Sequence, residues 1–69
     1  MRSMGYQAET GVLEIEFQSG EVYEYFDVPA DVYVGLEKAE SKGQYFNREI
    51  RDDYGYARKG KARGAGEAD

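Results

Sequence analysis

The stretch Val22-Tyr-Glu-Tyr-Phe-Asp-Val-Pro29 decides the fold. Its first half alternates between side chains of different polarity, which is the two-residue period of a β-strand. It ends in Pro29, whose fixed φ and missing amide hydrogen suit the first turn of an α-helix. The stretch therefore predicts a strand that passes directly into a helix, with Tyr23 and Tyr25 together on one face of the strand.

A second alternating segment, Leu13-Glu-Ile-Glu-Phe17, comes shortly before it, with apolar residues at odd positions and acidic residues at even positions. If Ser19-Gly20 forms a two-residue hairpin loop, Ile15 lies opposite Glu24, and the two tyrosines fall on the acidic face. The apolar face then consists of Leu13, Ile15, Phe17, Val22, Phe26 and Val28. Glu24 is the one residue on the apolar side that breaks this sorting.

Two further segments complete the expected fold. Met4-Gly-Tyr-Gln-Ala8 is predicted to be a short first strand, and the turn Glu9-Thr-Gly11 returns the chain to the second. After Pro29, apolar residues at helical spacing predict an α-helix that stops at Gly43. Residues 44–56 predict a short helix or turn and then a brief extended stretch, because Tyr54 and Tyr56 alternate as in a strand. The sequence thus predicts an α+β fold. It is a small three-stranded antiparallel β-meander with one α-helix packed on its apolar face and a short helical or turn segment after it.

Composition narrows the classes of function. The 69 residues carry a net charge of −5 and contain neither cysteine nor histidine, which excludes disulfides, thiolate metal sites and the commonest zinc ligand. No Asp-x-Asp-x-Asp-Gly calcium loop, Gly-rich phosphate loop or nucleophile–base pair is present, so we expect no metal, no cofactor and no enzymatic activity. No apolar segment is long enough for a signal peptide or a membrane span, and we expect a cytoplasmic monomer.

The end of the chain has a different composition. From Ala57 to Asp69 no residue is aromatic, and no aliphatic side chain is larger than alanine. Such a segment buries too little apolar surface to offset the entropy of ordering it. We therefore expect one folded domain over residues 2–56 and a disordered tail over residues 57–69, whose first half is basic.

Tyrosines exposed on a sheet are candidates for a contact surface. Tyr23 and Tyr25 would stack unpaired nucleic-acid bases, or they would be covered by the C-terminal segment, with their hydroxyls hydrogen-bonded at its edge. The expected register places acidic side chains beside them, which disfavours a phosphate on this face. The same acidic, tyrosine-rich face would suit a basic or aromatic protein partner, because tyrosine is enriched in protein interfaces.

A second candidate group lies in the segment Asn47-Arg-Glu-Ile-Arg51. Arg48 and Arg51 would both reach one phosphate, with Tyr45 and Tyr54 flanking them for stacking. The alternative is that both arginines pair internally with neighbouring acids. RNA binding through these residues and protein binding through the acidic face are the two functions that the residues leave open.

Several of these stretches occur together in one known family, and the chain resembles the KTSC domain from Ser3 to Tyr56. The stretches that carry the resemblance are Gly5-Tyr6, Leu13-Glu-Ile-Glu-Phe17, Val22-Tyr-Glu-Tyr-Phe-Asp-Val-Pro29, Ser41-Lys-Gly-Gln-Tyr-Phe-Asn47 and Ile50-Arg51. The family is named after a C-terminal extension of some lysyl-tRNA synthetases, and the domain also occurs alone as a small bacterial protein. The resemblance therefore implies a small stand-alone module with an RNA-binding role.

Overall fold

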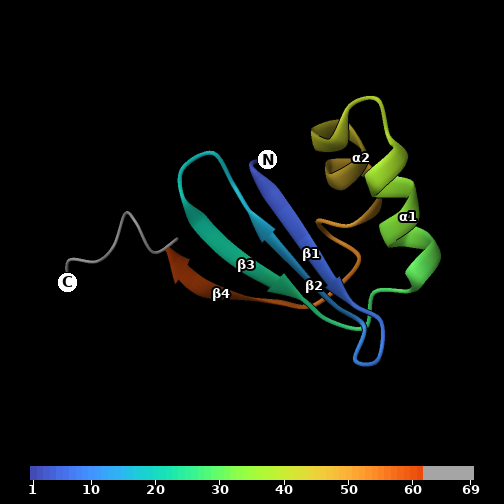
Figure 1. Cartoon of the computed structure of the whole chain (residues 1–69), viewed down its shortest axis with the longest axis horizontal. Helices are drawn as coiled ribbons and strands as arrows, with labels where there is room; N and C mark the ends of the chain where they lie inside the picture. Colours follow the sequence, from blue (N-terminus) through green and yellow to red (C-terminus); the bar gives the residue numbers. More distant parts are fainter. Residues whose placement is uncertain (62–69) are drawn as a thin grey trace.

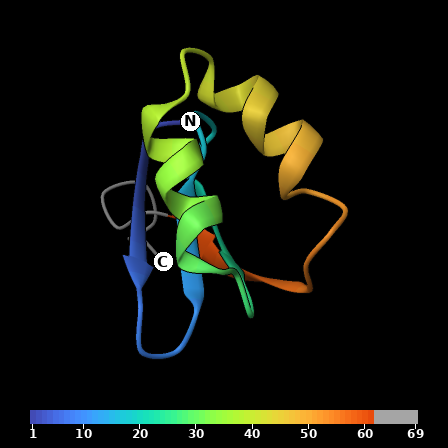
Figure 2. The same cartoon turned by 90° about the vertical axis from the view of Figure 1, so that its right-hand side faces the viewer.

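The computed structural model describes residues 1–61 and contains one antiparallel sheet and two helices. The elements follow in the order β1 (Ser3–Gln7), β2 (Val12–Glu16), β3 (Glu21–Tyr25), α1 (Ala30–Lys38), α2 (Lys42–Glu49) and β4 (Tyr56–Lys61). The strands lie side by side in chain order, and both helices lie on the same face of the sheet (Figure 1, Figure 2). The α+β class is confirmed, but the described residues form four strands rather than three, and two helices.

The hairpin between β2 and β3 has a different loop from the one predicted. The Phe17 amide donates to the Glu21 carbonyl at 2.9 Å, and the Gly20 amide donates to the Phe17 carbonyl at 2.9 Å. These bonds close a three-residue loop from Gln18 to Gly20, in which Gly20 has a φ of +93°. Glycine adopts this left-handed conformation without steric cost, and three-residue hairpin loops commonly need it. The predicted two-residue loop was therefore one residue too short.

That one residue reverses the two faces of β3. Leu13 lies opposite Tyr25, and Ile15 lies opposite Tyr23, so both tyrosines share the helix-facing side of the sheet with the apolar residues of β2. Because side chains alternate across a strand, a shift of one residue moves every side chain to the other face. The prediction that Tyr23 and Tyr25 lie on the acidic face was wrong.

Three other residues of this region change place for the same reason. Glu24, which did not fit the predicted register, lies opposite Glu14 on the face that bears no helix. Val22, predicted on the apolar face, lies opposite Glu16 on that same uncovered face. Phe26 follows the end of β3 and is 37% exposed, so it too does not belong to the apolar face on which it was predicted.

The fourth strand lies where a disordered tail was predicted. β4 pairs antiparallel with β3, beginning with Tyr56 opposite Tyr25, and one irregularity interrupts the register. An edge strand forms through backbone hydrogen bonds and needs few apolar side chains, and charged residues are typical of such edges. The sheet thus continues past the predicted domain boundary at Tyr56. The predicted tail over residues 62–69 lies outside the described residues.

Helix α1 begins where the sequence predicted, but it ends earlier. Pro29 is its N-cap, with a φ of −66°, and the helix ends at Lys38. The predicted stop, Gly43, lies inside α2. Ser41 marks the real break, because its hydroxyl accepts a hydrogen bond from the Gln44 amide at 3.3 Å. This contact caps the start of α2 and satisfies one of its free amide groups.

The two helices contact each other at a glycine. The Tyr45 hydroxyl of α2 donates to the Val32 carbonyl of α1 at 3.2 Å, and the ring lies against Gly35. A Cβ atom on Gly35 would stand 2.7 Å from Cζ and 3.0 Å from Cε2 of Tyr45. Gly35 therefore allows α2 to approach α1 closely, although a glycine inside a helix lowers its stability.

The hydrophobic core lies between the helices and the sheet. Leu36 of α1, Phe46 of α2 and Ile50 just after α2 are buried, and they form one cluster with Leu13 and Ile15 of β2. This packing places the C-terminal end of α2 above the sheet and leaves the side of β3 and β4 less covered (Figure 1). In residues 1–61 no helix has the length and apolar character needed to cross a membrane.

Candidate functional site

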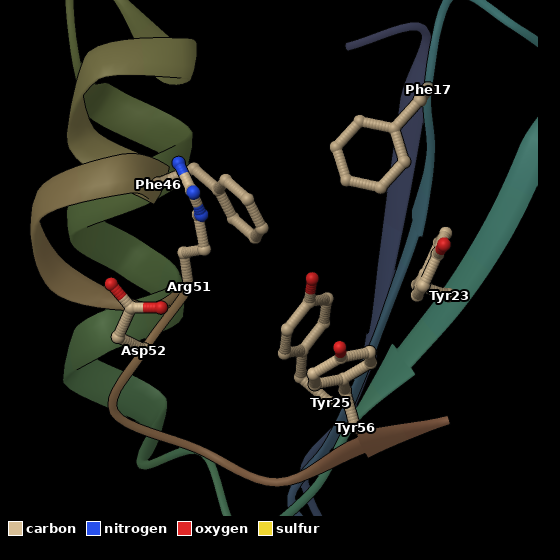
Figure 3. Close-up of a pocket in the computed structure, with 7 residues that line it drawn as sticks. All are labelled: Phe17, Tyr23, Tyr25, Phe46, Arg51, Asp52 and Tyr56. Atoms are coloured by element: carbon tan, nitrogen blue, oxygen red, sulfur yellow. The ribbon is translucent and has the colours of Figure 1, made fainter. Parts of the chain in front are cut away.

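An aromatic cleft opens between the end of α2 and the β3–β4 side of the sheet. Its volume is about 430 Å³, which is within the usual range of small-ligand sites. We define the aromatic cleft by its lining residues, which are Phe17, Tyr23, Tyr25, Phe46, Arg51, Asp52 and Tyr56. Figure 3 shows the sheet residues on one side of the open space and the residues of the α2 end on the other.

Tyr56 forms the exposed wall of the aromatic cleft. It is the first residue of β4 and lies opposite Tyr25 in the register. Its ring centroid is 5.4 Å from that of Tyr25 and 5.6 Å from that of Tyr23, yet 58% of the residue is exposed. Contacts with two neighbouring rings already restrict the Tyr56 side chain. It can therefore stack on a further flat group with little additional loss of conformational entropy.

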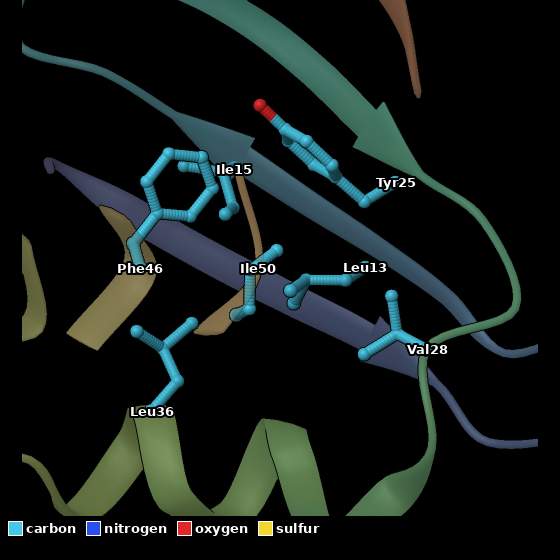
Figure 4. Packing of buried hydrophobic residues seen from close by; sticks show 7 residues of the cluster. All are labelled: Leu13, Ile15, Tyr25, Val28, Leu36, Phe46 and Ile50. Carbon is cyan, nitrogen blue, oxygen red and sulfur yellow. The ribbon is translucent and has the colours of Figure 1, made fainter. Parts of the chain in front are cut away.

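Tyr25 connects the aromatic cleft to the hydrophobic core. Its ring packs edge-on against Phe46, with the centroids 5.3 Å apart, and only 4% of the residue is exposed. Figure 3 shows its hydroxyl directed toward the cleft, and Figure 4 shows its ring within the buried cluster. Burial raises the pKa of Tyr25 above its ordinary value of 10.0; Tyr56 and Tyr23 add to the rise, and Arg51 opposes it. The hydroxyl therefore stays protonated at neutral pH and can donate a hydrogen bond.

Tyrosine hydroxyls in this structure differ in their partners. The Tyr6 hydroxyl donates to the Val28 carbonyl at 2.6 Å, and the Tyr45 hydroxyl donates to the Val32 carbonyl at 3.2 Å. Both bonds fix α1 and the segment before it. The hydroxyls of the three cleft tyrosines, in contrast, make no hydrogen bond to any residue in the described range 1–61, and none of them is a buried unsatisfied group. These three phenols are therefore available to a ligand.

Arg51 is the cation of the aromatic cleft. Its guanidinium lies 3.5 Å from Oδ1 of Asn47, at the limit of a hydrogen bond. Arg48, one turn earlier, pairs with Glu49 at 2.9 Å and lies 5.5 Å from the centroid of the Tyr45 ring. Arg48 also lines a different hollow, at the turn between α1 and α2. The sequence predicted that both arginines would reach one phosphate, but in the structure they line separate hollows.

Three more residues that the sequence singled out lie outside the aromatic cleft. Asn47 is exposed on α2, and Tyr45 lies between the two helices. Tyr54 is half-buried against the core. Burial, followed by the neighbouring Asp53 carboxylate, raises the pKa of Tyr54 above its ordinary value. Of the seven predicted site residues, the cleft therefore brings together Tyr23, Tyr25 and Arg51.

Sequence reasoning missed the other four lining residues, which are Phe17, Phe46, Asp52 and Tyr56. Phe17 and Phe46 carry the same apolar pattern as core residues, so nothing in the sequence separates the two roles. The alternation of Tyr54 and Tyr56 was the available signal for an extended segment after α2. That signal does not reveal which strand the segment pairs with, and the cleft depends on that pairing.

Acidic side chains gather on the other face of the sheet. Glu14 and Glu24 lie opposite each other there, and Nζ of Lys59 is 3.2 Å from the Glu14 carboxylate and 3.8 Å from that of Glu24. Near the cleft, Glu21 pairs with Arg58 at 3.3 Å. Glu14 and Glu16, which the predicted register placed opposite the two tyrosines, are thus on the opposite face, whereas Glu21 is not. The predicted tyrosine-rich acidic surface for a protein partner is not formed.

The aromatic cleft combines exposed ring faces, phenolic donors, one guanidinium and one carboxylate. Ring faces stack flat groups, and phenols and a guanidinium donate to acceptor atoms such as carbonyl or phosphate oxygens. Among residues 1–61 no group of three or more side chains is placed to hold a metal ion. The arrangement therefore suits recognition of a flat, acceptor-bearing ligand.

Comparison with known proteins gives relatives of two kinds. The chain is 46% identical over 54 residues to a lysine–tRNA ligase of Nostoc punctiforme, an alignment that covers 78% of this chain and 10% of the ligase. It is 41% identical over 54 residues to an uncharacterized protein of Stutzerimonas stutzeri, covering 78% of this chain and 76% of that protein. The chain thus spans about a tenth of the length of the ligase.

The fold has a solved counterpart. A crystal structure of a KTSC domain protein from Yersinia pestis matches with a TM-score of 0.81 and 31% identity, covering 84% of this chain and 82% of that one. The family model of the KTSC domain matches residues 1–54, so β4 and its Tyr56 lie beyond the matched range. The sequence and the fold together show that the chain belongs to the KTSC domain family, whose small domain is also found in some lysyl-tRNA synthetases.

Proposed function

We propose that this protein is a non-catalytic binding module that holds unpaired bases of single-stranded RNA in its aromatic cleft. The observation that carries the proposal is the Tyr56 ring, which is 58% exposed although it packs on two other tyrosines. Sequence-tolerant binding of single strands uses such ring faces, and each stacked base contributes roughly 1–3 kcal/mol. The name of the lysine–tRNA ligase relatives supports RNA over DNA as the first ligand to test.

One cation at the cleft and the distant position of two carboxylates favour this role. Arg51 lines the same cleft as Tyr56, and its guanidinium would contact a phosphate of the strand whose base stacks on that ring. The carboxylates of Glu14 and Glu24 lie on the far side of the sheet and are partly neutralised by Lys59. Exposed charges more than about 10 Å apart are largely screened at 0.1 M salt. The net charge of −5 is therefore compatible with binding at the cleft, and it predicts modest affinity.

The test compares two arginines of α2 and the turn after it. Fluorescence anisotropy with a fluorescein-labelled single-stranded RNA of about ten nucleotides measures Kd at low salt. Arg51→Ala should raise Kd about tenfold, since a charge-assisted contact is lost. Arg48→Ala removes the same charge from a neighbouring turn. Because Arg48 lines a different hollow, this change should alter Kd less than threefold. Tyr56→Ala should raise Kd by about 5-fold or more, because it removes the stacking ring.

Two results would contradict the proposal. One is the absence of RNA binding by the wild-type chain at about 50 mM salt, where electrostatic attraction is strong. The other is an equal loss for Arg48→Ala and Arg51→Ala, which would show that net charge, and not the aromatic cleft, governs the binding. Far-UV circular dichroism of each variant confirms that the fold is retained.

A protein-interaction module is the second candidate. The observation that favours it is Asp52, which places a carboxylate at the aromatic cleft and weakens the attraction for phosphate. Tyrosine-rich surfaces are typical of protein contacts as well as of base stacking. A specific protein captured from a lysate after nuclease treatment, and lost with Tyr56→Ala, would favour this function if the chain binds no RNA.

A further inference from the structure

The two edges of the sheet differ in how they are protected. β4, at one edge, carries Arg58 and Lys59, and its register with β3 is irregular. Charged side chains and bulges are the usual devices that stop an edge strand from pairing with another chain. β1, at the other edge, has the sequence Ser-Met-Gly-Tyr-Gln, with no charge, no proline and a regular register with β2. Within residues 1–61 no strand pairs with its outer side, and Figure 2 shows it at the margin of the sheet.

We infer that β1 pairs antiparallel with β1 of a second copy of this chain, about a two-fold axis at Gly5. The two four-stranded sheets then join into one continuous sheet with the helices of both copies on the same face. This inference concerns assembly and does not depend on the function proposed above. It also departs from the monomer that the sequence predicted, because an unprotected edge is visible only once the strand order is known.

The strand is complementary to itself in this arrangement. With Gly5 opposite Gly5, all five residues of β1 are paired, and any other register leaves residues at the ends unpaired. Met4 then lies opposite Tyr6 of the second copy on the helix side, where both side chains already pack against the core. Ser3 lies opposite Gln7 on the other side, and neither carries a charge. The closest cross-strand pairs are therefore one apolar pair and one polar pair, each occurring twice.

Helix α1 extends the same surface. Tyr33 stacks on Tyr6 of β1, with the ring centroids 4.8 Å apart and the planes within 9°. Gly35 faces α2 through Tyr45, so the flank of α1 that carries Tyr33 faces the β1 edge. Ala30 and Glu37 lie nearest to Tyr33 on that flank, since residues three and four apart are neighbours on a helix and successive residues are about 100° apart.

The pairing sets the distance between the two binding sites. A two-fold axis perpendicular to the sheet leaves both aromatic clefts on the helix side, each between β3 and β4 at its outer end. Six strand spacings then separate the clefts, which is about 30 Å. If the proposed function holds, one RNA strand that spans this distance would engage both clefts and bind more tightly than a short one.

The interface is small, so the association should be weak. Five strand residues and one helix flank bury less than the roughly 800 Å² per partner of a standard stable interface. Sedimentation equilibrium of the full 69-residue chain should therefore show a mass that rises from 7.8 kDa toward twice that value as the concentration increases to about 1 mM. A mass that stays at 7.8 kDa throughout would overturn the inference.

Charge placed on the edge should abolish the association. Ser3→Lys with Gln7→Lys brings lysines directly opposite each other twice across the axis, and like charges in that position repel. The double variant should stay monomeric, with at least a tenfold weaker association. Gln18→Lys with Gln44→Lys adds the same two charges at exposed positions away from β1, and it should associate like the wild type. Equal association by the two double variants would show that another surface is used.

A single cysteine locates the axis, because the natural chain contains none. Position 5 is exposed, and a Cβ atom there meets nothing within 4 Å. Gly5→Cys should be cross-linked into a covalent dimer by a short bis-maleimide at least ten times faster than Gln18→Cys, whose exposed position is in the loop between β2 and β3. Equal rates for the two variants would refute pairing at β1, whatever the sedimentation result.

Discussion

Gly35→Ala is a sensitive test of the packing between the two helices. In an ordinary helix this change stabilises the chain by about 1 kcal/mol, because alanine has the higher helix propensity. Here the new methyl group would stand 2.7 Å from Cζ of Tyr45 and 3.0 Å from its Cε2. The ring must move, and its hydrogen bond to the Val32 carbonyl, now 3.2 Å long, is lost with it.

The magnitude follows from three contributions. Overpacking of this kind costs about 1–3 kcal/mol, and the lost hydrogen bond costs about 1 kcal/mol. The gain in helix propensity offsets about 1 kcal/mol. Since a moving ring relieves part of the strain, we expect Gly35→Ala to lower the free energy of unfolding by about 1–2 kcal/mol. For a domain of this size each kcal/mol lowers Tm by roughly 4–8 °C.

Urea unfolding followed by far-UV circular dichroism measures the change. Gly43→Ala is the matched control, because this glycine also lies in a helix but has nothing within 4 Å of the added Cβ; it should be stabilising. In a Tyr45→Ala background the ring is absent, and Gly35→Ala should become stabilising as well. The packing described here is wrong if Gly35→Ala stabilises the wild-type chain as Gly43→Ala does, or if its effect is the same in both backgrounds.

Three further predictions concern the tyrosines and β4. The raised pKa of Tyr25 means that the folded chain holds this proton more tightly than the unfolded chain. The stability that the protonated Tyr25 hydroxyl contributes is therefore complete below about pH 10 and is lost as pH rises through the folded-state pKa. The urea midpoint of the wild-type chain should fall above pH 10, and it should fall less in Tyr25→Phe. At pH 7, Tyr6→Phe should lower the free energy of unfolding by about 1 kcal/mol, because its 2.6 Å bond to the Val28 carbonyl is lost. Tyr25→Phe should leave the free energy of unfolding nearly unchanged at this pH, because its hydroxyl bonds to no residue in the range 1–61. If urea titrations gave the same loss for both variants, these hydrogen-bond assignments would be wrong. A chain ending at Gly55 lacks β4 and should be less stable by at least about 2 kcal/mol than one ending at Lys61, since Tyr25 loses its cover; equal thermal melts would show that β4 contributes nothing.

The sequence predicted a good part of the fold. Alternating polarity indicated β2 and β3, and Pro29 indicated the start of α1, all of which the structure contains. The register was wrong because tyrosine has an apolar ring and a polar hydroxyl, so both faces of β3 looked acceptable. Glu24 indicated this error, because it was the charged residue that the predicted register placed on the apolar face. A three-residue loop moves Glu24 to the uncovered face and removes the conflict.

The candidate site was predicted less completely. Tyr23, Tyr25 and Arg51 were recognised as separate groups, on a strand and after a helix, and the structure brings them to one cleft. Tyr56 was not singled out, because it precedes a segment without large apolar residues that looked disordered. Its position depends on backbone hydrogen bonds between β4 and β3. Such bonds are the same for almost every residue type, so side-chain patterns indicate them poorly.

The sequence by itself determined the family, the α+β class and the residue types available for binding, because these follow from local patterns of polarity and from residue identity. The tertiary structure alone decided which face of the sheet carries the tyrosines, that β4 completes the cleft, and which arginine reaches it. The physical reason is that local periodicity is unchanged by a slip of one residue, whereas burial is reversed by it. The packing of α1 and α2 on one face favours the register in which the Tyr25 ring is buried and the carboxylates of Glu14 and Glu24 lie on the uncovered face.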